Sequence, residues 1–165
     1  RCVVAGAGFI LNNEMDDFSA KPGAPNIYGA VGGAANAIAA HKRPLSSMTP
    51  TIITKKGKLW MVVGTPGGTT IPTSVFHVIV NVIDFRKPLF EAVQAGRFHH
   101  QWKPDAIAVE EGISAVPEAT LSALRQKGHT LTKRTAIGRV EAIMRHKKRW
   151  QGVADRRGDD SAAGY

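Results

Sequence analysis

The chain has 165 residues, of which 43% are hydrophobic and 21% charged, a composition typical of a soluble globular domain and unlike a disordered segment. No apolar run approaches the roughly 18 residues of a membrane-spanning helix, and the single cysteine excludes an intrachain disulfide. The formal net charge is +9. The densest basic run, Arg145 to Trp150, is compatible with nucleic-acid contact, but its place between two short apolar strands favours a solvated hairpin tip.

A short acidic stretch follows the first apolar run of the chain. Phe9 to Leu11 predicts a strand of the buried type, and Glu14, Asp16 and Asp17 come directly after it. Charge at the end of a buried strand requires a partner, and a substrate ammonium would supply one. A solvated loop with an Asx turn explains the same residues.

The next stretch contains a long Gly- and Pro-rich loop and a pair of hydroxyls. Residues 22–33 are too rich in these two residues for regular structure, and loops of this length often serve as lids, with Tyr28 able to close over a site or to act as a surface anchor. Ser46 and Ser47 offer adjacent hydroxyls that suit a carboxylate, although turn chemistry explains them equally well.

The chain is organised around a Gly-rich turn, Gly64 to Thr70. A hairpin over residues 51–63 delivers an apolar strand to this turn, and an apolar helix predicted over residues 73–85 leaves it, apolar nearly all round and therefore expected to be buried. The glycines direct several backbone N–H groups the same way, so the turn suits an anion or a developing oxyanion. A connection that needs glycine only for steric reasons remains the alternative.

The rest of the chain alternates short helices and strands. We expect a packing role for His77, and no metal site at His99 and His100, because adjacent histidines in a strand point to opposite faces. The pattern predicts an α+β layered domain. Its remaining elements are expected as helices at 88–95 and 117–124 and strands at 106–109, 129–133, 140–144 and 150–153.

Five stretches, in order and consistently spaced, resemble the small subunit of γ-glutamyltranspeptidase (glutathione hydrolase). They are LNNEMDDF (11–18), PLSSMTP (44–50), GTPGGT (64–69), RFHHQW (97–102) and DRRGDDSAAGY (155–165). The resemblance implies an αββα sandwich of the N-terminal-nucleophile hydrolase type, with residues 1–165 as a single domain forming most of the small subunit. It also implies a precursor that cleaves itself, leaving the large subunit as partner.

The resemblance implies γ-glutamyl transfer from glutathione and similar compounds to water, amino acids or peptides, with no cofactor or metal and no nucleic acid. Glu14 and Asp17 would hold the substrate ammonium, Ser46 and Ser47 its carboxylate, and Gly67 and Gly68 the oxyanion, with Tyr28 in the lid. Some relatives carry glutamine in place of Glu14.

The nucleophilic threonine of the family would lie before Arg1, so we expect the 165-residue chain alone to be inactive. A periplasmic or secreted location is expected from the resemblance. The alternatives are a cephalosporin or glutaryl acylase of the same superfamily and a non-catalytic binding module.

Overall fold

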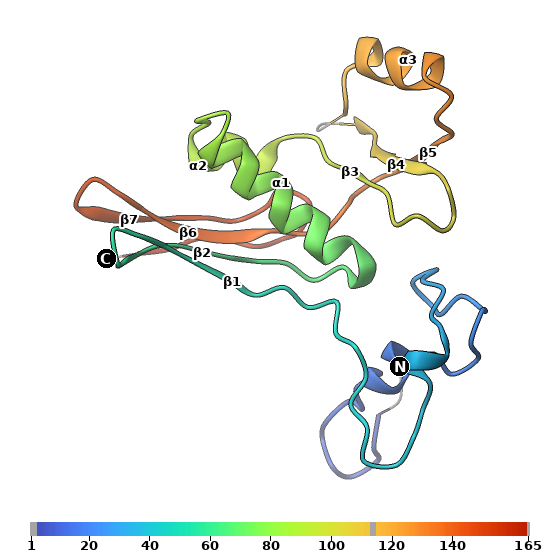
Figure 1. Ribbon diagram of the computed structural model, residues 1–165. Helices are drawn as coiled ribbons and strands as arrows, with labels where there is room; N and C mark the ends of the chain where they lie inside the picture. Colours follow the sequence, from blue (N-terminus) through green and yellow to red (C-terminus); the bar gives the residue numbers. More distant parts are fainter. Residues whose placement is uncertain (1–2, 113–114, 165) are drawn as a thin grey trace. The chain divides into compact units, whose positions relative to one another are not determined.

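The computed structural model describes residues 3–112 and 115–164 and divides into two compact units, Arg1–Ser46 and Ser47–Tyr165 (Figure 1). The N-terminal unit contains only short elements: 3-10 helices at Glu14–Asp17 and Ala34–Asn36, and isolated bridges between Val3 and Ile10 and between Pro25 and Val31. It is held mainly by hydrogen bonds within and between its turns.

The strand expected at Phe9 to Leu11 does not form as predicted. Only Ile10 pairs, in its single bridge with Val3, and each of the three side chains is at least half exposed within this structure. An apolar run is buried only where another element covers it, and no described segment of this unit does so. The prediction of a buried strand is therefore wrong for the chain as it stands.

The second unit begins with the predicted hairpin. Strands β1 (Thr51–Lys55) and β2 (Lys58–Gly64) pair antiparallel, with Thr51 opposite Val63. The two-residue turn places Lys56 at φ 53° and Gly57 at φ 72°, the left-handed geometry that matches the twist of the flanking strands. This hairpin delivers the chain to the Gly-rich turn.

A second antiparallel hairpin completes a four-stranded sheet of order β1-β2-β6-β7. Strand β6 (Glu141–His146) pairs with β2 and with β7 (Arg149–Val153), so the basic residues Lys147 and Lys148 form a hairpin tip, as predicted. Helices α1 (Ile71–Ile83) and α2 (Leu89–Gln94) lie over one face of this sheet (Figure 1). The core between them is built from Met61, Val63, Val75, Val78, Val82, Leu89, Ala92, Val93, Val140, Ala142, Met144 and Val153.

Helix α1 is buried on one face rather than all round. Its buried residues recur at helical spacing (Ile71, Ser74, Val75, Val78 and Val82) and face the sheet. Phe76, on another side of the helix, is 60% exposed. The prediction of burial all round is wrong, because no described segment covers the side of the helix that carries Phe76.

A three-stranded sheet of order β3-β4-β5 forms the rest of the unit. Strand β3 (Phe98–His99) pairs antiparallel with β4 (Ile107–Glu110), which pairs parallel with β5 (Leu131–Arg134) after a crossover through α3 (Glu118–Gln126). All four β4 residues are buried, and Ile107 and Val109 pack with Leu121 of α3. Both sheets and their helices confirm the α+β class, and none of the helices described is long and apolar enough to cross a membrane.

Candidate functional site

The acidic turn is a 3-10 helix, Glu14–Asp17, in the N-terminal unit. The Oδ1 atom of Asn12 accepts the N–H of Glu14 at 3.1 Å, which is the Asx turn expected of this sequence. Residues three apart eclipse each other in a 3-10 helix, so the backbone places Glu14 and Asp17 on the same side. Among the described residues neither carboxylate forms an ion pair. The turn thus presents two negative charges on one side.

The Gly- and Pro-rich loop of residues 22–33 folds back on the acidic turn. The carboxylate of Asp16 accepts the N–H of Ile27 at 3.1 Å, and Asn13 donates its side-chain amide to the hydroxyl of Tyr28 at 3.1 Å. Asn26 organises the loop itself, since its Oδ1 accepts the N–H groups of Tyr28 and Ala30, each at 3.0 Å. Within this unit the structure therefore brings Tyr28 to the acidic turn.

Ser46 and Ser47 lie at the boundary between the two units. Ser46 is the last residue of the first unit and Ser47 the first of the second. Thr49 donates its hydroxyl to the carbonyl of Ser47 at 3.0 Å, an interaction typical of a turn. Of the predicted site residues, Glu14, Asp17, Tyr28 and Ser46 thus belong to one unit, and Ser47, Gly67 and Gly68 to the other, so their assembly into one site stays a prediction.

The Gly-rich turn connects β2 to α1 through a 3-10 turn at Gly68–Thr70. Gly67 and Gly68 both adopt positive φ, 145° and 57°. A Cβ at Gly67 would lie 2.5 Å from the hydroxyl oxygen of Thr70, so only glycine fits. The N–H groups of Gly67 and Gly68 donate to no other group in the described chain, and Gly67 is exposed. Two neighbouring unused N–H donors in such a turn suit an anion.

A chain of polar side chains ties this turn to β3. The hydroxyl of Thr69 donates to Oε1 of Gln101 at 2.8 Å, and the same oxygen lies 2.9 Å from Nε2 of His99. Nδ1 of His99 lies 2.8 Å from the hydroxyl of Thr73 in α1. His99 is buried, and His100, which follows the end of β3, is exposed. His99 therefore connects the Gly-rich turn and helix α1 to β3 through these polar contacts.

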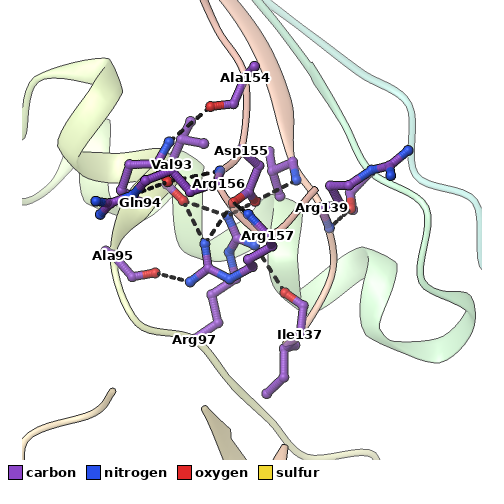
Figure 2. A network of polar contacts seen from close by, with 12 residues as sticks. Val93, Gln94, Ala95, Arg97, Ile137, Arg139, Ala154, Asp155, Arg156 and Arg157 are labelled. Atoms are coloured by element: carbon purple, nitrogen blue, oxygen red, sulfur yellow. Dashed lines mark hydrogen bonds and ion pairs between the residues drawn. The ribbon is translucent and has the colours of Figure 1, made fainter. Parts of the chain in front are cut away.

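The second unit also contains a buried ion-pair network that the sequence analysis missed (Figure 2). Arg97 is 1% exposed and lies 2.8 Å from the carboxylate of Asp155, which is equally buried. Arg157 pairs with Asp155 at 2.9 Å and also with Glu110 at the end of β4. Two cations thus neutralise two anions. Backbone groups make further hydrogen bonds to these side chains: the carbonyls of Val93 and Ile137 accept from Arg97, and the N–H of Val140 donates to Asp155.

The network lowers the pKa of both Asp155 and Arg97. Burial alone would raise the pKa of Asp155, but the N–H of Val140 and the charge of Arg97 outweigh it and hold that pKa below its usual value. Burial, with the neighbouring charge of Arg157, lowers the pKa of Arg97. The carboxylate of Asp155 therefore remains ionised and fixes the residues that follow β7 against α2.

The fold matches solved structures that belong to the N-terminal-nucleophile hydrolases, and the comparisons identify the family. A family model for gamma-glutamyltranspeptidase matches residues 1–165. The chain is 51% identical over 166 residues to the glutathione hydrolase proenzyme of Escherichia coli, an alignment that covers 99% of this chain and 28% of that protein. The chain belongs to the γ-glutamyltranspeptidase family, and it spans somewhat more than a quarter of the length of this relative.

Solved structures agree with this assignment. The gamma-glutamyltranspeptidase of Pseudomonas nitroreducens, complexed with L-DON, is 44% identical and superposes with a TM-score of 0.92 over 99% of this chain and 86% of its own. A cephalosporin acylase from Bacillus halodurans is 26% identical, with a TM-score of 0.70 over 79% of this chain and 24% of its own. The α+β fold expected from the sequence is thus confirmed.

Proposed function

We propose that the protein carrying this chain cleaves γ-glutamyl amides, glutathione among them, through a γ-glutamyl acyl-enzyme. The acyl group passes to water or to an amino acid or peptide acceptor. The observation that carries the proposal is the pair of unused N–H groups at Gly67 and Gly68, in a chain that belongs to the γ-glutamyltranspeptidase family. Attack on the amide carbonyl turns its oxygen into an oxyanion, which these donors stabilise more strongly than the carbonyl they first meet.

The N-terminal unit supplies the recognition of the amino-acid head group. Glu14 and Asp17 bind the substrate ammonium, which two carboxylates on one side of a 3-10 turn attract strongly. Ser46, and with it Ser47 at the start of the second unit, donates a hydroxyl hydrogen bond to the substrate carboxylate. Tyr28 covers the bound head group from the loop that Asn13 and Asp16 hold beside the acidic turn. The attacking threonine, placed by resemblance before Arg1, is not among these residues.

The partner of this chain is the large subunit made from the same precursor, as the word proenzyme in the relative's name suggests. The face of the four-stranded sheet opposite the helices supports this proposal. Ile52, Val62 and Ile143 lie side by side across three strands of that face, and they are 69%, 39% and 51% exposed. A row of exposed apolar side chains on a sheet indicates a covering layer.

We also propose a periplasmic or secreted location.

A substrate comparison tests the proposed function against the acylase alternative, which the likeness to the Bacillus halodurans cephalosporin acylase supports. The full-length protein carrying this sequence should turn over a γ-glutamyl anilide far faster than the glutaryl anilide, which lacks the ammonium. Asp17→Asn should raise KM for the γ-glutamyl anilide roughly tenfold or more, since a hydrogen bond to a charged group is lost. The exposed Glu91→Gln serves as the matched control. Equal turnover of the two anilides would favour the acylase.

A further inference from the structure

Two threonine hydroxyls in the Gly-rich turn donate to carbonyl groups of the turn itself. Oγ1 of Thr65 lies 2.7 Å from the carbonyl oxygen of Pro66. Oγ1 of Thr70 lies 2.9 Å from the carbonyl oxygen of Gly67, which also accepts the backbone N–H of Thr70 at 3.2 Å. Each hydroxyl thus holds one end of a peptide group in the turn.

The other ends of these two peptide groups are the candidate oxyanion donors. The carbonyl of Pro66 shares its peptide plane with the N–H of Gly67, and the carbonyl of Gly67 shares its plane with the N–H of Gly68. In a planar trans peptide the carbonyl and the N–H point in opposite directions. Fixing the carbonyl therefore fixes the direction of the N–H, and glycine, which lacks a Cβ, leaves the peptide free to rotate unless something holds it.

The hydroxyl of Thr65 is itself held in place. Its oxygen accepts the N–H of Arg139 at 2.7 Å, so it receives one hydrogen bond and donates another. The loop that carries Arg139 packs closely, because a Cβ at Gly138 would come 3.1 Å from this same oxygen and 2.5 Å from the hydroxyl of Ser74. The loop between β5 and β6 thus sets the position of Thr65.

Thr70 departs from the usual behaviour of its position. It is the N-cap of α1, where a threonine hydroxyl ordinarily accepts a hydrogen bond from the first turn of the helix. Here the side chain makes no capping hydrogen bond, and its hydroxyl donates backwards to Gly67 instead. The residue is 3% exposed, so solvent does not compete for this contact. The arrangement forgoes a helix cap and orients a peptide group.

We propose that Thr65 and Thr70 are positioning residues that aim the N–H groups of Gly67 and Gly68 at the oxyanion. This proposal rests on the proposed function and adds to it the side chains that preorganise the donors. Preorganisation matters because a donor that must reorient during the reaction loses much of its stabilising effect on the transition state.

The test uses Thr65→Val and Thr70→Val in the full-length protein, assayed with a γ-glutamyl anilide. Each variant keeps the side-chain shape and removes the hydroxyl, so kcat should fall roughly tenfold, less than the 100-fold or more caused by losing an oxyanion donor outright. KM should stay unchanged, because the oxyanion exists only in the transition state. Thr65→Ser and Thr70→Ser retain the hydroxyl and should restore kcat. The exposed Thr132→Val of β5 is the matched control.

A second measurement separates a positioning role from a structural one. A glutamate analogue with a boronic acid in place of the γ-carboxyl forms a tetrahedral anionic adduct. Its affinity for both valine variants should fall by about the same factor as kcat, while the affinity for glutamate should stay unchanged. Unchanged kcat in both variants would overturn the proposal. So would a fall in kcat that the serine variants fail to restore. An inactive wild-type protein would instead contradict the proposed function.

Discussion

The guanidinium of Arg97 lies 2.8 Å from the carboxylate of Asp155, and each residue is only 1% exposed. The two are separated by 57 intervening residues, since Arg97 precedes β3 and Asp155 follows β7. Their contact connects the segment between the two sheets with the C-terminal tail (Figure 2). Together with the pair of Glu110 and Arg157, this contact fixes the residues after β7 against the rest of the second unit.

Removing one member of this pair should destabilise the protein strongly. Asp155→Asn leaves the buried cation of Arg97 without its counter-charge, and breaking a buried pair in this way costs about 3–5 kcal/mol of unfolding free energy. Urea denaturation of the wild type and the variant measures the loss. A loss below about 1 kcal/mol would show that the pair contributes no more than an exposed one.

The exposed pair of Arg125 and Glu118, at 2.6 Å in α3, is the matched control for that experiment. Solvent screens it, so Glu118→Gln should change the unfolding free energy by at most about 1 kcal/mol. The double variant Arg97→Met with Asp155→Leu should recover part of the stability lost in Asp155→Asn, because it removes the unpaired cation. The recovery should be incomplete, since the N–H of Val140 loses its acceptor.

Stability should also fall with decreasing pH because of His77. Burial, reinforced by the charge of Arg97, lowers the pKa of His77 from about 6.5 to about 4. The unfolded chain therefore takes up a proton as pH falls through about 6.5, while the folded protein does not do so until about 4. The unfolding free energy should decline across this interval.

His77→Phe removes the titrating group and keeps a ring to pack against Phe98, whose centroid lies 4.3 Å from that of His77. The unfolding free energy of this variant, measured between pH 7 and pH 4, should change less steeply than that of the wild type. His129→Gln, at an exposed position before β5, removes a histidine elsewhere and should leave the wild-type slope in place. Identical slopes for wild type and His77→Phe would refute the assignment.

The sequence pattern correctly predicted the elements that depend on residues close together in the chain. The hairpin predicted over residues 51–63 follows from two apolar runs on either side of a Lys-Gly turn. The Gly-rich turn follows from its glycines, and at Gly67 a Cβ would not fit. The packing role of His77 was also anticipated, since its ring lies against Phe98. For the hairpin and the turn the deciding residues lie within a few positions of one another, whereas the partner of His77 lies 21 residues along the chain.

The features that were missed depend on residues far apart in the chain. Arg97, Glu110, Asp155 and Arg157 look like solvated charges in sequence, and only the tertiary structure shows that they neutralise each other. A signal was present, because Arg97 and Asp155 both lie in the stretches that carried the family resemblance, but local pattern gave neither a role. The exposure of Phe9 to Leu11 was likewise unpredictable, because burial depends on what covers a segment.

Gln101 should prove important for stability despite its place near the surface. Its Oε1 lies 2.8 Å from the hydroxyl of Thr69 and 2.9 Å from Nε2 of His99, so Gln101→Leu leaves both groups without this partner. His99 is 4% exposed and cannot turn to solvent, which makes a loss of about 1–3 kcal/mol in unfolding free energy the expected result. Urea denaturation of Gln101→Leu measures this loss. Gln126→Leu, a substitution at an exposed position at the end of α3, is the matched control.

Two glycines of the Gly-rich turn, Gly67 and Gly64, should respond differently to substitution by alanine. At Gly67 a Cβ would lie 2.5 Å from Oγ1 of Thr70, and φ is 145°, so Gly67→Ala must displace either the turn or the buried Thr70 side chain. Such strain costs of the order of 1–3 kcal/mol in stability. It should also reduce kcat for a γ-glutamyl anilide sharply, since the N–H groups of the turn would move.

Gly64 ends β2 three residues earlier, and a Cβ there would meet nothing within 4 Å. Gly64→Ala therefore adds the same methyl group to the same connection without the clash, and both its unfolding free energy and its kcat should stay close to those of the wild type. If the two alanine variants lost kcat equally, the effect would come from stiffening the connection, and the specific geometry of Gly67 would have no part in catalysis.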